Sequence, residues 1–273
     1  MLDWTLSTLR IGLSKNVVSV LQTSRWRGPR VMMLKEARFF GPTDSAPQLM
    51  RVLESALAEI DLGSGWASVV LSDEWVHYFG VTLPANVSRL ADCREIAALR
   101  FQRLYDLDPA DWAIEASWSV SHDFMACAMP RWLINALHEF AGRHGLHLTG
   151  IVPQFVGAWN QWHTRIAPDS WFGLVHHNRI TFSALQGKRP VDADTLLAYG
   201  QEEHNASWLE EQLTRNALVR SRPAPTRIYL CGTLPPAWPT APGEAFHVIP
   251  LKAPELRGLP SSPGVLLAMQ GAR

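Results

Sequence analysis

Residues 9–21 read LRIGLSKNVVSVL, and this stretch determines how the chain begins. Two runs rich in Val, Ile and Leu flank the polar residues 14–16, a pattern typical of two strands joined by a turn. A third apolar run, residues 31–34, follows a turn that contains Gly28 and Pro29. The sequence therefore predicts a three-stranded antiparallel meander at the start of the chain.

Helices and strands alternate after this meander. Apolar residues recur at three-and-four spacing in residues 46–60, which predicts an amphipathic helix. Further helices are predicted at residues 89–107, 130–145, 155–162 and 194–218, and further strands at residues 66–71, 75–83, 112–120, 124–129, 146–152 and 227–232. From Asp169 the pattern restarts with a second hairpin. This order predicts an α/β fold with mixed sheets and two lobes, residues 1–168 with an inserted subdomain and residues 169–273.

Composition argues against several classes of function. The chain has 273 residues, and its 25 basic side chains balance 25 acidic ones, so no overall field attracts nucleic acid or an anionic membrane. Its three cysteines are widely spaced, which fits a reducing compartment and excludes a paired-thiol metal site. The first residues do not resemble a signal peptide, and no run of about 18 apolar residues occurs. We therefore expect a cytoplasmic protein without direct membrane insertion.

Common catalytic and binding motifs do not occur in the sequence. There is no glycine-rich dinucleotide or phosphate loop and no serine elbow. His138 and His144 are spaced so that a helix would place them on different faces, which excludes a zinc protease site. His176 and His177 fall at the turn of the second hairpin and are expected to be exposed rather than to hold a metal. No metal site is predicted.

One basic stretch leaves an alternative open. Arg25, Trp26, Arg27 and Arg30 combine cations with an aromatic ring, as nucleic-acid-binding surfaces do. Cations on a β-meander are more often a solvated strand face. We therefore predict no nucleic-acid partner and keep a nucleic-acid-binding adaptor as an alternative.

The order of elements resembles a known family. Residues 126–152 combine a strand, a helix, Gly145 and a second strand, and Pro153 follows. Together with the first hairpin, this segment resembles the actin-like cytoplasmic proteins of type IV pilus and type II secretion machines, namely the PilM-like proteins and the cytoplasmic domains of GspL and its relatives. The second hairpin resembles the first hairpin of their second lobe, and residues 228–232 resemble the strand before their adenine-side glycines. This resemblance implies a two-lobed actin-like (ribonuclease-H-like) fold.

An actin-type ATPase carries an acid on the first strand of each lobe, followed by glycines and a Ser or Thr that hold the phosphates. Here residues 11–16 read IGLSKN and residues 173–178 read GLVHHN, without an acid at either turn. The resemblance therefore implies a degenerate nucleotide site, with no cofactor and no catalytic residue, in a pseudo-ATPase that is not an enzyme. If ATP does bind, as in an atypical ATPase, the candidate contacts are Ser14, Lys15 and Gly232.

The resemblance also implies a role and a location. Such proteins are scaffolds at the cytoplasmic face of the bacterial inner membrane. The cytoplasmic tail of a bitopic assembly protein holds them there, and they link it to the hexameric motor ATPase. GspL-like relatives carry a C-terminal spanning helix, and this sequence ends at Arg273 without one, so we expect either the separate soluble form or an excised domain. The prediction is a peripheral scaffold of a type IV pilus or type II secretion assembly platform.

Overall fold

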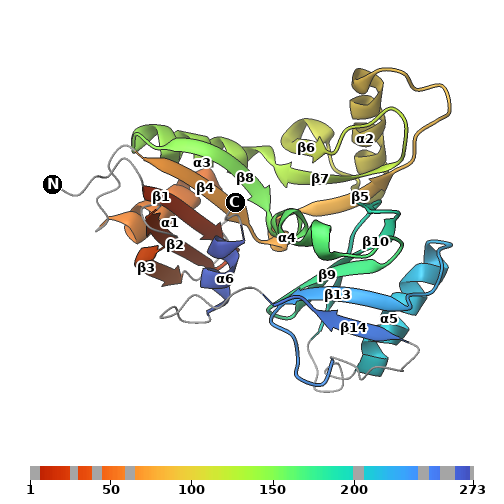
Figure 1. The fold of residues 1–273 in the computed structure, drawn as a ribbon. Coiled ribbons are helices and arrows are strands. Elements are labelled where there is room, and N and C mark those ends of the chain that lie inside the picture. The colour runs from red at the N-terminus through yellow and green to blue at the C-terminus, as the bar shows by residue number, and fades with distance from the viewer. Residues whose placement is uncertain are drawn as a thin grey trace.

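The computed structural model describes residues 7–24, 30–38, 45–58, 65–198, 206–238, 246–252 and 262–270. They form two large sheets and one small sheet. Figure 1 shows the first large sheet with its helices on one side of the molecule, and the small sheet and the second large sheet on the other. Within these residues, no helix has the length and apolar character needed to cross a membrane.

The first large sheet has the strand order β3-β2-β1-β4-β8. Its strands are β1 (Ser7–Leu13), β2 (Val17–Ser24), β3 (Arg30–Arg38), β4 (Trp66–Leu71) and β8 (His147–Pro153). The first three strands are antiparallel, whereas β4 runs parallel to β1 and β8 runs parallel to β4. The predicted meander is thus confirmed. Its strands bury Ile11, Leu13, Val18 and Val20 in the main hydrophobic core, since aliphatic side chains suit a covered sheet.

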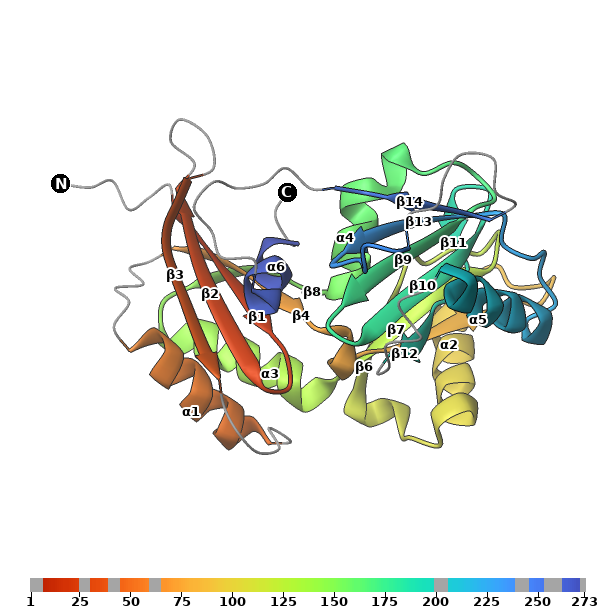
Figure 2. The same cartoon turned by 90° about the horizontal axis from the view of Figure 1, so that it is seen from below.

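Helices cover both faces of this sheet (Figure 2). α1 (Ala46–Leu57) and α3 (Arg131–Arg143) pack on one face, and α6 (Pro263–Met269) lies across β1 and β2 on the other. The backbones of α6 and β1 approach closely, because a Cβ on Gly12 would lie 2.7 Å from the backbone N of Ala268. The last described helix therefore packs with the first sheet, although the predicted division at residue 169 groups it with the second lobe. The domain boundaries themselves remain predictions.

The second large sheet has the order β11-β10-β9-β13-β14, and β12 also pairs with β10. Its strands are β9 (Trp171–His176), β10 (Arg179–Gln186), β11 (Arg189–Pro190), β12 (Asp194–Leu197), β13 (Arg227–Gly232) and β14 (His247–Pro250). β9 and β10 form an antiparallel hairpin, and β13 runs parallel to both β9 and β14. Both large sheets therefore start with a hairpin and continue with parallel strands, as the restart at Asp169 predicts. α5 (Ala206–Val219) packs Leu209 and Leu213 into the core of this sheet.

The helix predicted at residues 194–218 is wrong in its first part. Residues 194–197 form β12, which pairs antiparallel with Arg179–Phe182 of β10. The backbone N–H and C=O groups of this segment pair with the edge of β10. In the first turn of a helix, the backbone N–H groups would have no such partners. The Thr195 hydroxyl also lies 3.3 Å from the Thr181 hydroxyl of β10. α5 begins at Ala206, and residues 199–205 lie outside the described residues.

The small sheet is inserted between β4 and α3. Its order is β5-β7-β6, and all of its pairs are antiparallel. Its strands are β5 (His77–Val81), β6 (Trp112–Ala116) and β7 (Phe124–Pro130). α2 (Leu90–Tyr105) covers the small sheet with Cys93, Ala97 and Phe101. α4 (Gln154–Trp162) follows β8 and packs against β9, so it leads the chain from the first large sheet to the second.

Candidate functional site

The turn between β1 and β2 meets a short turn that follows β4. This second turn is a 3-10 helix, η2 (Asp73–Trp75). The backbone N–H of Ser72 donates to the carbonyl oxygen of Leu13 at 2.8 Å, which places η2 beside the end of β1. The backbone N–H of Lys15 then donates to Glu74 Oε2 at 3.2 Å. A carboxylate 59 residues away in sequence thus lies at the first hairpin turn.

The second lobe reaches the same carboxylate. Arg179 begins β10, directly after the β9–β10 turn, and its Nε lies 3.5 Å from Glu74 Oε1. The two side chains retain 31% and 25% of their accessible surface, so this ion pair is partly shielded from water. Because Glu74 contacts both Lys15 and Arg179, the two hairpin turns lie within reach of one side chain. We call this place the inter-lobe junction, defined by Lys15, Asp73, Glu74 and Arg179.

Asp73 is buried at the inter-lobe junction. Its Oδ1 accepts hydrogen bonds from the Tyr78 hydroxyl at 2.6 Å and from the backbone N–H of Phe155 at 3.0 Å. The side chain of Thr181 of β10 has a lowering effect on the pKa of this carboxyl group, so the second lobe also acts on Asp73. Burial raises the pKa of Asp73 above its ordinary value, against the opposing effect of these hydrogen bonds. Burial and the neighbouring Asp73 also raise the pKa of Tyr78.

Ser14 and Lys15, two of the predicted phosphate contacts, lie in the β1–β2 turn. The Ser14 side chain is buried and serves the turn itself, since its Oγ accepts from the backbone N–H of Val17 at 3.0 Å and lies 3.0 Å from Asn16 Oδ1. The Lys15 ammonium lies over the Trp75 ring, 5.4 Å from its centre. Lys15 lines a pocket of about 620 Å³ together with Trp75, Trp112 and other residues.

The second hairpin turn carries His176 and His177. The expectation that both are exposed is wrong for His176, which ends β9 and is buried. Its Nε2 has no hydrogen-bond partner among the described residues. Burial, together with the nearby His177, lowers the pKa of His176 to about 3, so its ring is neutral at physiological pH. A neutral ring adds no positive charge for a phosphate group.

Gly232, the third predicted contact, ends β13 with φ +95°, a conformation that favours glycine. A Cβ at this position would lie 1.9 Å from the carbonyl oxygen of Val175, so the two backbones meet without a side chain between them. The next residue, Thr233, donates its backbone N–H to the same oxygen at 3.0 Å. Gly232 therefore fixes how the end of β13 approaches β9.

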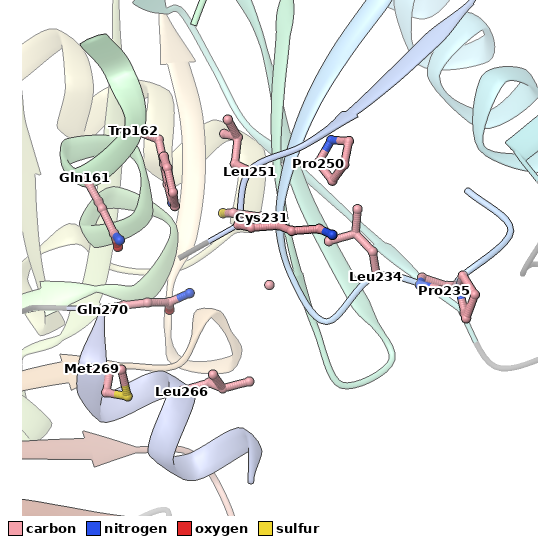
Figure 3. Close-up of a pocket in the computed structure, with 13 residues that line it drawn as sticks. Gln161, Trp162, Cys231, Leu234, Pro235, Pro250, Leu251, Leu266, Met269 and Gln270 are labelled. Atoms are coloured by element: carbon pink, nitrogen blue, oxygen red, sulfur yellow. The ribbon is translucent and has the colours of Figure 1, made fainter. Parts of the chain in front are cut away.

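Gly232 also lines a pocket of about 660 Å³ between the lobes (Figure 3). Side chains from α4, α6 and the ends of β13 and β14 surround this pocket, among them Trp162, Leu251, Leu266 and Met269. Lys252 is the single charged residue among the described residues that line it. Lys15 lines a different pocket, so the structure does not gather Ser14, Lys15 and Gly232 around one cavity.

A third pocket, of about 630 Å³, lies between the small sheet and α4. We call it the β7–α4 groove. The residues that define it come from β6, the β6–β7 connection, β7, β8, α4, the β10–β11 turn and β11: Glu115, Ala116, Ser117, His122, Asp123, Phe124, Met125, Cys127, Met129, Ile151, Val152, Pro153, Val156, Trp159, Asn160, Lys188, Arg189 and Pro190. Its walls are mostly apolar. Burial raises the pKa of the Cys127 thiol to about 12, so this cysteine is not a reactive nucleophile.

Within the described part of the chain, no group of three or more His, Cys, Asp or Glu side chains could hold a metal ion. The basic stretch offers no structural test of nucleic-acid binding. Arg25, Trp26 and Arg27 lie outside the described residues, and Arg30 is described only as the first residue of β3. The prediction about this stretch stays a prediction.

The sequence analysis did not single out Asp73 and Glu74. The sequence feature that could have identified them is a pair of adjacent acids that follows the buried strand β4, separated from it by Ser72 alone. The Ser72 hydroxyl accepts a hydrogen bond from the backbone N–H of Glu74. Acids after a buried strand often mark a site, but the strand alone does not show what they face. The contacts with Lys15, Phe155 and Arg179 required the folded chain.

Each of the two large sheets starts with a hairpin, and the two hairpin turns face each other. This arrangement defines the class of fold. The chain has the actin-like ATPase fold. It is similar to a chain of the PilM–PilN type IV pilus biogenesis complex, with 14% identity and a TM-score of 0.62 over 89% of this chain and 88% of that one. It is also similar to the cytoplasmic domain of EpsL, an inner-membrane component of the type II secretion system of Vibrio cholerae. That match has 12% identity and a TM-score of 0.57 over 97% of this chain and 94% of that one.

A third similar structure is a protein of unknown function with an actin-like ATPase fold from Bacteroides thetaiotaomicron, with 12% identity and a TM-score of 0.55 over 86% of each chain. No family model and no curated protein matches the sequence. At these identities the likeness establishes the fold. The resemblance to PilM-like and GspL-like proteins is thereby confirmed at the level of the fold.

Proposed function

We propose that this chain is a non-catalytic scaffold of a type IV pilus or type II secretion assembly platform, located at the cytoplasmic face of a bacterial inner membrane. The observation that carries the proposal is an actin-like fold whose two hairpin turns lack the acids of an ATPase. The similar structures include a cytoplasmic domain of an inner-membrane component and a chain of the PilM–PilN type IV pilus biogenesis complex. The proposed role transfers to this chain what the names of those similar structures say about them.

The nucleotide chemistry supports a degenerate site. Phosphoryl transfer depends on a metal ion and on donors that are positioned around the phosphates. β1 and β9 contain no Asp or Glu that could organise magnesium at either turn. The Ser14 hydroxyl serves the turn, and His176 is neutral and buried. We therefore infer a pseudo-ATPase that uses no cofactor.

The β7–α4 groove is the proposed docking surface for the cytoplasmic tail of a bitopic inner-membrane protein. Met125 of β7 and Val156 of α4 are partly exposed in the groove, and the buried Cys127 and Met129 lie beneath them, so apolar side chains of a peptide could contact Met125 and Val156. Methionines adapt to ligands of different shape. Lys188 and Arg189 at one border and acids elsewhere on the rim would orient the peptide. The motor ATPase is a further proposed partner, without an assigned surface.

Peptide binding by fluorescence anisotropy tests this proposal. The probes are labelled cytoplasmic tails of bitopic inner-membrane proteins from the same organism, each paired with a scrambled version. Val156→Glu places a carboxylate in the apolar groove, and we expect at least about a tenfold loss of affinity, because burying an unpaired charge costs more than about 1.4 kcal/mol. Val219→Glu is the matched control, since Val219 is 77% exposed at the end of α5, away from the groove.

Calorimetry with magnesium ATP tests the non-catalytic part. We expect no heat of binding by the wild-type protein. A micromolar affinity for ATP would refute the degenerate site. Tail peptides that bind Val156→Glu as tightly as wild type would refute the groove as the docking surface.

A further inference from the structure

The segment from Ser72 to Trp75 is fixed to the first lobe and extends toward the second. Ser72 is held at the end of β1 by the 2.8 Å hydrogen bond from its backbone N–H to Leu13. Its hydroxyl accepts from the backbone N–H of Glu74 at 3.4 Å, which shapes the turn. Asp73 and Glu74 then contact α4 and β10, the elements that follow in the second half of the chain.

Glu74 lies in an environment that suits an anion. A backbone N–H at a turn and an arginine side chain are the groups that commonly bind phosphate or carboxylate oxygens. At the inter-lobe junction, the backbone N–H of Lys15 comes from the first hairpin turn and Arg179 from the residue after the second. Each contacts a different oxygen of the same carboxylate, Oε2 and Oε1. The anion that bridges the two turns is therefore part of the chain itself.

The register of the second sheet supports a joint contact. Arg179 and Thr181 are two residues apart on β10, so their side chains point to the same face. Arg179 forms an ion pair with Glu74, and both Arg179 and Thr181 lower the pKa of Asp73. Asp73 and Glu74 are consecutive residues of η2. One face of β10 thus receives both acids. Asp73 adds a contact with α4 through the backbone N–H of Phe155.

We propose that Ser72–Trp75 is an internal plug of the inter-lobe junction: the Glu74 carboxylate takes the place that a phosphate group would take between the two hairpin turns. It holds the lobes together without a nucleotide. This inference rests on the degenerate nucleotide site of the proposed function, and it gives a physical reason why that site would not bind a nucleotide. An entering phosphate would meet both an occupied backbone donor and the negative charge of Glu74. The scaffold therefore keeps one arrangement of its lobes.

Hydrogen exchange followed by mass spectrometry tests the plug. We expect Glu74→Ala to speed exchange at least threefold in peptides that cover residues 13–18 and residues 176–182, because both turns lose a partner. Glu74→Gln keeps the shape of the side chain but loses the charge, and it should show a smaller change in the same peptides. Glu54→Ala is the matched control, because Glu54 forms an exposed ion pair with Arg143 between α1 and α3 of the same lobe.

Binding of pyrophosphate, measured by calorimetry, gives a second readout. Glu74→Ala should bind pyrophosphate at least tenfold more tightly than wild type, and adding Arg179→Ala should abolish this gain. Unchanged exchange in either turn, or equal pyrophosphate binding by wild type and Glu74→Ala, overturns the proposal. Circular dichroism shows whether Glu74→Ala folds. If it does not fold, the same measurements on Glu74→Gln test the proposal.

The two proposals fail in different ways. Glu74 does not line the β7–α4 groove, so Glu74→Ala should bind tail peptides as wild type does. A failed plug with normal tail binding leaves the scaffold function intact. Binding of magnesium ATP by the wild-type protein would remove both the degenerate site and the plug.

Discussion

Replacing Asp73 shows how strongly the inter-lobe junction is held. Its Oδ1 accepts hydrogen bonds from the Tyr78 hydroxyl at 2.6 Å and the Phe155 backbone N–H at 3.0 Å, in a buried place. Asp73→Ala leaves two buried donors without an acceptor, and each costs about 1–3 kcal/mol, so we expect a loss of about 2–6 kcal/mol in the free energy of unfolding. Asp73→Asn keeps an oxygen for both donors and removes a buried charge, so its loss should stay below about 1 kcal/mol.

The pH dependence of this effect has a defined sign. Burial raises the pKa of Asp73 in the folded protein above the ordinary value of 3.8. The protonated carboxyl group is thus favoured on folding, so its contribution to stability is fully present below the unfolded pKa and is lost as pH rises through the folded pKa. Asn cannot titrate. The free energy of unfolding of Asp73→Asn should therefore increase relative to wild type as pH rises above 3.8.

Urea unfolding followed by tryptophan fluorescence measures both effects, since the chain has 12 tryptophans. The series compares wild type, Asp73→Ala and Asp73→Asn from acidic to neutral pH. Equal stability of the Ala and Asn variants would refute the role of the two hydrogen bonds. A stability difference between Asp73→Asn and wild type that does not change with pH would refute the raised pKa.

Three further predictions concern other parts of the molecule. Arg222→Ala removes the partner that contacts both oxygens of the buried Asp192 at 2.6 and 2.8 Å and leaves Arg220, 3.8 Å from Oδ2, as the remaining cation. Thermal or urea unfolding should show a loss of about 1–3 kcal/mol, and a loss below about 0.5 kcal/mol would contradict the structure. A phosphate-release assay with magnesium ATP should give no activity above buffer for wild type or Lys15→Ala, whereas activity lost in Lys15→Ala would favour the atypical ATPase. A gel shift with single-stranded DNA at low salt should show no complex, and a salt-dependent shift abolished by Arg25→Glu with Arg27→Glu would support the nucleic-acid adaptor.

Sequence patterns were sufficient to predict those helices and strands whose formation depends on residues close together in the sequence. The run LRIGLSKNVVSVL forms β1, the turn and β2 as predicted, because apolar runs around a polar triplet specify a hairpin. Apolar spacing likewise predicts α3 and α4 to within about two residues of their bounds. Residues 194–197 could not be predicted in this way, since β12 exists only because the edge of β10 accepts it. The burial of His176 was missed for a similar reason, because the packing around β9 decides it.

The sequence by itself determined which chemical groups are available. It shows that neither hairpin turn carries an acid, and that Ser14, Lys15 and Asn16 are the polar residues at the first of them. Only the tertiary structure decided which groups meet. Glu74 reaches Lys15 across 59 residues and pairs with Arg179 of the other lobe, and α6 returns from the end of the chain to lie on β1. Such contacts depend on how sheets and helices pack, and packing joins residues whose separation along the chain carries no signal of their proximity.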